Sequence, residues 1–246
     1  MNLKVEERDV LISRLKDLAD RRDSGNYCTF SPFLGPDVLS EARRIKNVVL
    51  WGGYDDAERV VAAFLPDYMS EQDVDWPISV LVITPSDGKT YNHRDYLGSL
   101  MSLGIKRQVM GDIIVDGERA YLFCQESIEE FVINNLTHVA GTLVNVRKAD
   151  ADKELPKRKY EKITGTVASE RLDTVVALAA NTSRSRAAEF ITAGNVTVNG
   201  REMIKTTFVP KEGDIFSVRG KGKFVYGGAL GVSRKGRTVI EIKKYI

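Results

Sequence analysis

Between residues 77 and 148, strand-like and helix-like spacings of apolar side chains follow one another in the order β-α-β-β-α-β. The predicted elements cover residues 78–84, 92–103, 112–115, 120–124, 128–136 and 142–146. Asp116 and Gly117 separate the two central strands, and this dipeptide is a strong signal for a hairpin between antiparallel neighbours. The order therefore predicts a ferredoxin-like (RRM-like) βαββαβ middle domain with two helices on one face of its sheet. Many RNA-binding modules share this fold, although a fold alone does not establish a function.

The segment before the middle domain, residues 1–76, is predicted to be an N-terminal α/β segment. Helical spacing predicts helices over residues 3–22, 37–46 and 55–64, and the apolar run at 48–51 predicts a short buried strand. Gly52 and Gly53 follow that strand without a Lys-Ser/Thr pair or a GxGxxG pattern. A tight turn is therefore favoured over a phosphate cradle at this point.

Residues 149–165 are rich in charge and are interrupted by Pro156, which predicts a linker. Its basic half, Lys157-Arg158-Lys159, leaves two interpretations open: a solvated connector, or a strap that touches RNA. The remaining residues, 166–246, are predicted to form a small C-terminal domain. The fold class predicted for the whole chain is thus α+β and multi-domain.

The C-terminal domain shows two apolar stripes at helical spacing, over residues 172–179 and 187–194, which predict two short helices on a common core. Ser183 or Thr182 is suited to cap the start of the second helix, and Gly194 is suited to end it in a left-handed conformation. Asn199-Gly200 predicts a tight hairpin, and further strands are expected over residues 215–218, 223–226 and 238–242. The domain is therefore predicted to be a helix-helix-β unit.

Charge is divided unevenly along the chain. Residues 161–246 contain 15 Lys and Arg against 8 Asp and Glu, a net charge of +7, whereas residues 1–160 contain 21 against 26, a net charge of −5. A basic end of this kind is expected to meet a polyanion. The sequence contains no run of about eighteen apolar residues and no signal-peptide pattern, so a cytoplasmic protein without a membrane partner is expected.

The most specific chemistry lies at the start of the second C-terminal helix, in Ser183-Arg184-Ser185-Arg186. A helix N-terminus presents free N–H groups and the positive end of the helix dipole, so it favours phosphate. Two guanidinium groups can grip phosphate oxygens or stack on bases, and two hydroxyls supply further donors. The sequence therefore predicts an RNA-binding surface here. Other cations of the domain are candidates to extend it: Arg171, Arg201, Lys205, Lys221, Lys223, Arg234, Lys235 and Arg237.

Three blocks of this domain closely resemble the S-four RNA-binding domain, which is named for a small-subunit ribosomal protein. They are Arg171-Leu172-Asp173, SRSRAAEFITAGNVTVNG from Ser183 to Gly200, and GDIFSVRG from Gly213 to Gly220. The resemblance implies that the second helix lies against structured RNA, with Arg184, Ser185 and Arg186 in the contacting positions. Asp173 is interpreted as a structural residue that holds an arginine or backbone donors near the first helix, and not as a catalytic one.

Blocks upstream of the C-terminal domain extend the resemblance to nearly the whole chain. FSPFLGP at residues 30–36, WGGYDDAER at 51–59, and NHRDYLGSLMSLGIKR with GDI between residues 92 and 113 resemble the YlmH-like family. This resemblance implies a non-enzymatic RNA-binding protein that docks on ribosomal RNA of the large subunit, in ribosome-associated quality control of stalled peptidyl-tRNA. Transfer RNA or peptidyl-tRNA is a second candidate partner, and protein partners are left open.

Two other function classes remain as alternatives. An RNA-modifying enzyme of the pseudouridine synthase or methyltransferase type is one, because the S-four module is often attached to such enzymes; here the module comes last and no Gly-rich cofactor loop follows a strand. A cell-division adaptor is the other, and nothing in the sequence positively supports it. Cys28 and Cys124 lie far apart without ligand-spaced histidines, so no metal site, cofactor or catalytic residue is predicted.

Overall fold

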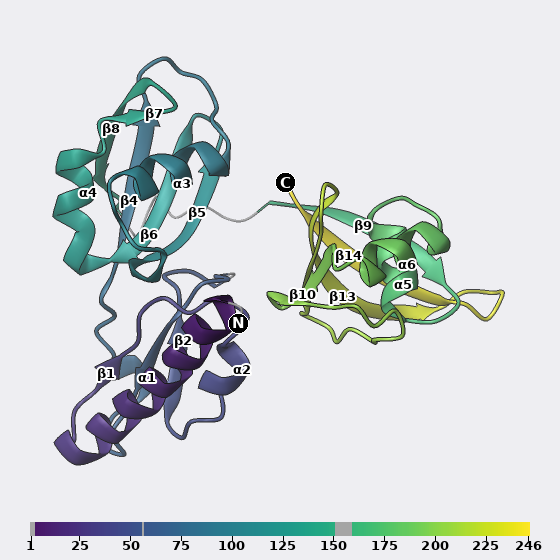
Figure 1. Ribbon diagram of the computed structural model, residues 1–246, viewed down its shortest axis with the longest axis horizontal. Coiled ribbons are helices and arrows are strands. Elements are labelled where there is room, and N and C mark those ends of the chain that lie inside the picture. Colours follow the sequence, from purple (N-terminus) through teal and green to yellow (C-terminus); the bar gives the residue numbers. More distant parts are fainter. Residues whose placement is uncertain (1–2, 56, 151–158) are drawn as a thin grey trace. The chain divides into compact units, whose positions relative to one another are not determined.

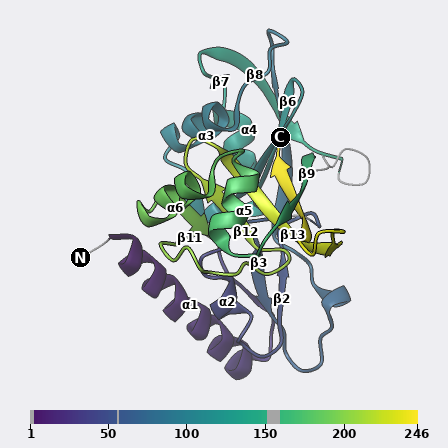
Figure 2. The same ribbon diagram turned by 90° about the vertical axis from the view of Figure 1, so that its right-hand side faces the viewer.

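The computed structural model describes residues 3–55, 57–150 and 159–246. The chain divides into two compact units, residues 1–157 and 158–246, and both are drawn in Figures 1 and 2. Within the described residues, the first unit contains a three-stranded and a five-stranded sheet, and the second contains a six-stranded sheet. Helices accompany each sheet, so the predicted α+β, multi-domain class is confirmed.

The first unit begins with a long helix packed on the small sheet. Its elements are α1 (Leu3–Gly25), β1 (Thr29–Phe30), α2 (Leu39–Ala42), β2 (Val48–Trp51) and β3 (Val61–Phe64). The strands follow the order β1-β3-β2 and pair antiparallel. Leu15 of α1, Val38 beside α2 and Phe64 of β3 are fully buried in the core between the helices and the sheet.

The helix predicted over residues 55–64 is wrong, because its apolar half forms strand β3. Every residue of Val61–Phe64 is buried, and the strand pairs with β1 on one side and β2 on the other. A short, fully buried apolar run has the same composition in a central strand as in a buried helix, so periodicity could not separate the two. The helix predicted over residues 37–46 is present only as α2, which continues in turns closed by hydrogen bonds such as Ile45 N to Ala42 O.

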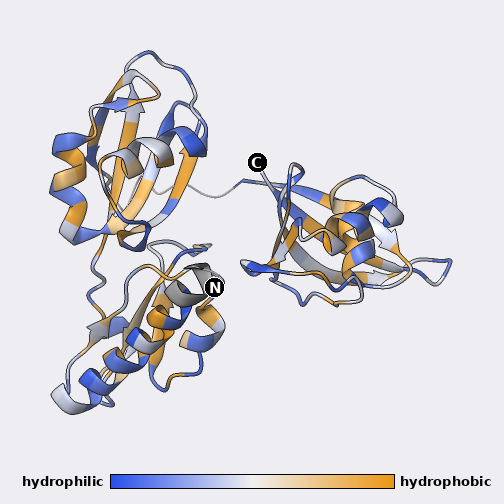
Figure 3. Cartoon of the chain, in the orientation of Figure 1, coloured by the Kyte–Doolittle hydropathy of each residue, from blue (hydrophilic) through white to orange (hydrophobic). Residues whose placement is uncertain are grey.

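The middle of the first unit has the predicted βαββαβ order. Its main elements are β4 (Ile78–Pro85), α3 (His93–Ser102), β5 (Met110–Asp116), β6 (Arg119–Gln125), α4 (Glu129–Asn135) and β8 (Thr142–Lys148). Short additions are the 3-10 helices η1 (Glu71–Asp73), η2 (Arg107–Val109) and η3 (Glu126–Ile128), and strand β7 (His138–Val139). The strand order β5-β6-β4-β8-β7, with antiparallel neighbours throughout, confirms the ferredoxin-like arrangement. Figure 3 shows its central strands coloured as hydrophobic.

Both faces of this sheet are buried over its central strands. On one face, Leu81 and Leu122 pack with Tyr96 and Leu100 of helix α3. On the other face, the Phe123 ring is covered by the N-terminal part of the same unit, since its centroid lies 4.7 Å from that of Tyr54.

After β2 the chain bends at Gly53, and the hydrogen-bonded turn follows directly, closed by Ala57 N to Tyr54 O at 3.3 Å. Gly53 has a φ of +96°, and a Cβ there would lie 2.6 Å from the Phe123 ring. Only glycine meets both demands at this position without strain.

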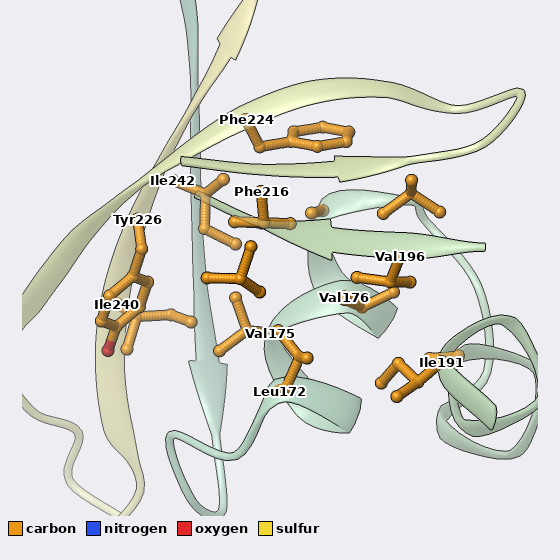
Figure 4. Close-up of a cluster of buried hydrophobic side chains, with 14 of the residues drawn as sticks. Leu172, Val175, Val176, Ile191, Val196, Phe216, Phe224, Tyr226, Ile240 and Ile242 are labelled. Atoms are coloured by element: carbon orange, nitrogen blue, oxygen red, sulfur yellow. The ribbon is translucent and has the colours of Figure 1, made fainter. Parts of the chain in front are cut away.

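The second unit is a six-stranded sheet covered by two helices. Its elements are β9 (Tyr160–Val167), α5 (Leu172–Ala179), α6 (Arg184–Thr192), β10 (Val196–Val198), β11 (Arg201–Glu202), β12 (Ile215–Val218), β13 (Gly222–Val232) and β14 (Thr238–Tyr245). The strand order is β11-β10-β12-β13-β14-β9. Figure 4 shows the core, in which Leu172 and Val176 of α5 and Ile191 of α6 lie among sheet residues such as Phe216 and Ile240.

The predicted linker over residues 149–165 extends too far toward the C-terminus. Tyr160–Val167 forms strand β9, which pairs with β14 along its whole length, from Tyr160–Tyr245 to Val167–Thr238. Its alternating residues include few strong apolar side chains, and its partner lies more than seventy residues later in the sequence, so no local signal marked it. Lys157 and Arg158, two of the three residues of the predicted strap, lie outside the described residues.

Candidate nucleic-acid interface

The start of helix α6 has the geometry that its sequence predicts. Ser183 is the N-cap with an extended backbone, and its hydroxyl accepts a hydrogen bond from Arg186 N at 3.2 Å. Arg184 and Ser185 occupy the first turn, where backbone N–H groups have no partner within the helix, and both side chains are exposed. Gly194 ends the helix with a φ of +70°. The helix end is therefore a fixed and accessible site for an anion.

Asp173 holds two arginines at this end of the domain. Arg184 Nε donates to Asp173 Oδ2 at 2.9 Å, Arg184 Nη2 forms an ion pair with the same oxygen at 2.9 Å, and Arg171 Nη2 donates to it at 3.1 Å. The Asp173 side chain is only 6% exposed, whereas the side chains of Arg184 and Arg171 are 53% and 37% exposed. The predicted structural role of Asp173 is thus confirmed: a buried carboxylate orients two cations that face solvent.

Electrostatics favour the charged form of this carboxylate. Burial by itself raises the pKa of Asp173, but hydrogen bonds from Arg184 and Thr174 and the charges of the two arginines outweigh burial and lower the pKa below its ordinary value. The Nε and Nη2 edge of the Arg184 guanidinium contacts Asp173, so the Nη1 donors can bind another acceptor. A phosphate oxygen is the natural acceptor for such a pre-oriented fork.

Arg186 has a different environment. Its Nη1 donates to Glu189 at 2.9 Å, one turn later on the same helix, and its guanidinium lies 5.5 Å from the centroid of the Phe190 ring. An exposed pair of this kind is weak, so it can exchange for a stronger contact. Glu189 follows Arg186 by three residues, a spacing at which two side chains on one helix face can pair.

The other predicted contacts are not all brought together. Lys205 is exposed at the start of a loop whose carbonyls, Thr206 O and Phe208 O, accept hydrogen bonds from the N–H groups of Asp173 and Leu172. It therefore lies beside the start of α5. Arg201 is exposed on the short strand β11, opposite Val198 in the Asn199-Gly200 hairpin.

The remaining cations occupy opposite ends of strand β13. Lys221 lies in the turn that precedes it, and Lys223 follows with its Nζ 5.5 Å from the Tyr245 ring. Arg234, Lys235 and Arg237 lie in the turn that joins its other end to β14. The predicted extension of the RNA surface is thus split into two groups.

Comparisons with known proteins identify both parts of the chain. Residues 71–153 match a family described as "Putative RNA-binding domain in YlmH", and residues 170–214 match the S4 domain. The "Ribosome-associated protein quality control protein P2" of Bacillus subtilis (strain 168) is 33% identical over 174 residues, which cover 70% of this chain and 68% of that protein. The chain belongs to the YlmH-like family. The predicted resemblance is confirmed.

A solved structure of a YlmH protein agrees in fold. It is described as "Cell division protein ylmH from Streptococcus pneumoniae" and superposes with a TM-score of 0.52 at 19% sequence identity, covering 63% of this chain and 98% of that one. At this identity the likeness concerns the fold alone.

The middle domain of this YlmH-like chain does not offer the open sheet face that RRM domains use to stack bases. The aromatic residues of its central strand β6, Tyr121 and Phe123, are buried against the N-terminal part of the unit. Arg107, one of its basic residues, is half-buried, and burial lowers its pKa. The accessible cations of the S4 domain are therefore the better-defined candidates for nucleic-acid contact.

The described residues show neither a metal-binding cluster nor a membrane-spanning helix. No group of His, Cys, Asp and Glu among them is arranged to hold a metal ion. Within the same part of the chain, no helix combines the length and the apolar character needed to cross a membrane.

Proposed function

We propose that this YlmH-like protein is a non-enzymatic RNA-binding factor that docks on ribosomal RNA of the large subunit through the start of helix α6. The observation that carries the proposal is the Asp173-held pair of arginines beside a capped helix N-terminus. Side-chain cations, free N–H groups and hydroxyls coincide there, and all of them suit phosphate. The contacting residues in this proposal are Arg171, Ser183, Arg184, Ser185, Arg186, Arg201 and Lys205.

The place of action that we propose is ribosome-associated quality control, with stalled peptidyl-tRNA on the large subunit as the situation that the protein recognises. Support comes from the name of the Bacillus subtilis relative, a ribosome-associated quality control protein. The RNA-binding families matched by both parts of the chain point the same way. Transfer RNA is the second partner in this proposal.

The experiment replaces Arg184 and Arg186 with Ala in the full chain and measures binding to purified large-subunit ribosomal RNA across a salt series. Each lost phosphate contact should reduce the slope of log affinity against log salt by about 0.7–0.9. We expect the double variant to bind at least about tenfold more weakly, with a slope smaller by about 1.4–1.8. The matched control is Arg219→Ala with Lys221→Ala, which removes two exposed cations from the turn at the far end of the sheet.

Unchanged affinity and slope in the Arg184→Ala, Arg186→Ala variant would refute the proposed contact. Large and small subunits, and large subunits with and without bound tRNA, should be compared by co-sedimentation, and preference for tRNA-bearing large subunits is expected. Digestion of the recovered RNA tests the non-enzymatic part, since a newly modified nucleoside would revive the RNA-modifying alternative.

A further inference from the structure

The turn between β13 and β14 carries a second concentration of positive charge in the C-terminal unit. Arg234, Lys235 and Arg237 are exposed, and none of them forms an ion pair with any residue that the structure describes. The sequence from residue 215 to residue 240 contains no Asp or Glu, so no carboxylate of the hairpin neutralises them. We call Ser233–Arg237 the basic tip. It lies beyond residues 170–214, the part that matches the S4 domain.

The basic tip has a defined conformation. Ser233 N donates to Arg237 O at 2.7 Å, Gly236 N donates to Ser233 O at 2.9 Å, and Arg237 N donates to Ser233 Oγ at 3.1 Å. Gly236, with a φ of +73°, occupies the left-handed position that the turn requires. Three cations are therefore presented from a closed turn, which lowers the entropy cost of binding.

The strand that leads to the basic tip is bent by irregular pairing. The register between β13 and β14 shifts between Tyr226 and Ala229 and again between Ala229 and Gly231. Bulges of this kind redirect a strand and often occur beside functional sites. Beyond them, Leu230 and Val232 are 58% and 73% exposed, so the hairpin carries apolar side chains in solvent next to its cations.

The basic tip leaves the sheet at the same end at which the arginine pair lies. Thr238, the residue after Arg237, pairs with Val167, the last residue of β9. Arg171 follows Val167 by four residues, which a chain spans in at most about 14 Å. The turn that contains Lys221 lies at the opposite end of β13, where Arg219 N donates to Asn195 O just after the end of α6. Two separate basic groups therefore share one end of the unit.

We infer that the basic tip is a second RNA-binding arm, which contacts the phosphate backbone of the same RNA that the start of α6 binds. This inference rests on the proposed function and adds a site to it. Charge supports it, because unpaired cations beside an arginine surface extend a single positive field over a polyanion. The exposed apolar residues fit as well, since Leu and Val side chains can pack on unstacked bases or sugars where Arg and Lys hold the backbone.

The test replaces Arg234 and Lys235 with Ala in the full chain and measures affinity for large-subunit ribosomal RNA across a salt series. The control is again Arg219→Ala with Lys221→Ala, which removes one Arg and one Lys from the other end of β13. We expect the tip variant to bind about tenfold more weakly with a salt slope smaller by about 1.4–1.8, and the control to stay close to the unmodified protein. An equal loss in both variants would show a non-specific charge effect and overturn the inference.

A second measurement locates the contact without removing charge. A benzophenone amino acid in place of Val232 should crosslink to the RNA, whereas the same group in place of Lys221 should not. Absence of a crosslink from position 232, with affinity retained, would overturn the inference. Binding of the unmodified protein to phosphatidylserine vesicles, abolished by Arg234→Ala with Lys235→Ala while RNA binding is retained, would assign the basic tip to a lipid surface instead.

The two proposals fail in distinguishable ways. If Arg184→Ala with Arg186→Ala weakens RNA binding and the tip variant does not, the proposed function stands and the second arm is refuted. If the unmodified protein does not bind the RNA at all, the proposed function fails and the second arm fails with it.

Discussion

Asp173 is the residue on which the geometry of the candidate site depends. It is buried in the first turn of α5, yet its carboxylate receives hydrogen bonds from arginines on two different elements. A buried carboxylate is stable as an anion only where donors replace water, and here the donors are the same groups that are proposed to bind RNA. Folding of the domain and presentation of its cations are therefore linked through one side chain.

We expect Asp173→Asn to lower the free energy of unfolding of the C-terminal unit by about 1.5–3 kcal/mol, because two charge-assisted hydrogen bonds lose their anionic acceptor. The pKa of Asp173 is lowered in the folded state, so its contribution is present above the unfolded pKa of about 3.9 and is lost as the pH falls through the folded value. The difference in unfolding free energy between the unmodified protein and the Asp173→Asn variant should thus be fully present at pH 7 and should disappear as the pH falls below about 4. Chemical denaturation at several pH values measures it, and a gap that does not change with pH would contradict the assignment.

Residue-scale signals in the sequence were reliable where chemistry is local. The cap at Ser183, the left-handed Gly194 and the Asn199-Gly200 hairpin, with φ values of 48° and 75° at Asn199 and Gly200, are all confirmed. Each depends on a few neighbouring residues, so a short motif determines it. The surroundings of the arginines depend on tertiary contacts, and only the family resemblance pointed to Asp173.

At the scale of elements, a clear periodicity of apolar residues is sufficient to predict a helix or strand, and a weak periodicity is not. The βαββαβ order of the middle domain and the two helices α5 and α6 were predicted because their apolar residues repeat clearly. Strands β3 and β9 were missed for different reasons. β3 is a uniformly buried run that resembles a helix segment, and β9 lies at the end of a charged stretch and is stabilised by a partner distant in sequence.

Strand β9 sets the true start of the C-terminal domain, and this can be tested with two fragments. A fragment of residues 158–246 should fold, because it retains every strand of the six-stranded sheet. A fragment of residues 168–246 keeps the whole S4 match but lacks β9, so it loses buried Val167 and leaves β14 as an unpaired edge. We expect a cooperative thermal transition by circular dichroism for the first fragment and a broad or absent transition for the second. Equal stability of the two would show that β9 is dispensable.

At the scale of the whole molecule, the sequence blocks that resemble the family meet inside the first unit. They meet in a hydrogen-bond network around Arg59 and Asp112, which we call the joint. Arg59 donates to the carbonyls of Met110 at 2.9 Å and of Phe33 and Arg107 at 3.0 Å each. Beside it, the Tyr54 hydroxyl donates to the buried carboxylate of Asp112 at 2.7 Å. Segments around residues 30–36, 51–59 and 105–113 thus share one hydrogen-bond network, whose function in the fold is to fix the N-terminal part on the ferredoxin-like sheet.

This joint predicts how the full chain unfolds. Burial, together with the neighbouring Arg107, lowers the pKa of Arg59 to about 10 even though Asp112 and other carboxylates oppose the shift, so the group stays charged at neutral pH and its hydrogen bonds remain strong. Arg59→Met would remove one donor from each of three carbonyls, of which the Arg107 carbonyl keeps the Met110 N–H, and we expect a loss of roughly 2–4 kcal/mol. Because the network joins both parts of the first unit, these parts should melt together, at a lower temperature than before, while the transition of the C-terminal unit stays in place.

Calorimetry of the full chain measures both transitions, with Arg119→Met as the control because Arg119 is exposed on β6. RNA affinity should stay unchanged in both variants, since the proposed contacts all lie in the C-terminal unit. If Arg59→Met shifts both thermal transitions, the two units depend on each other for stability. If it weakens RNA binding, they depend on each other for function.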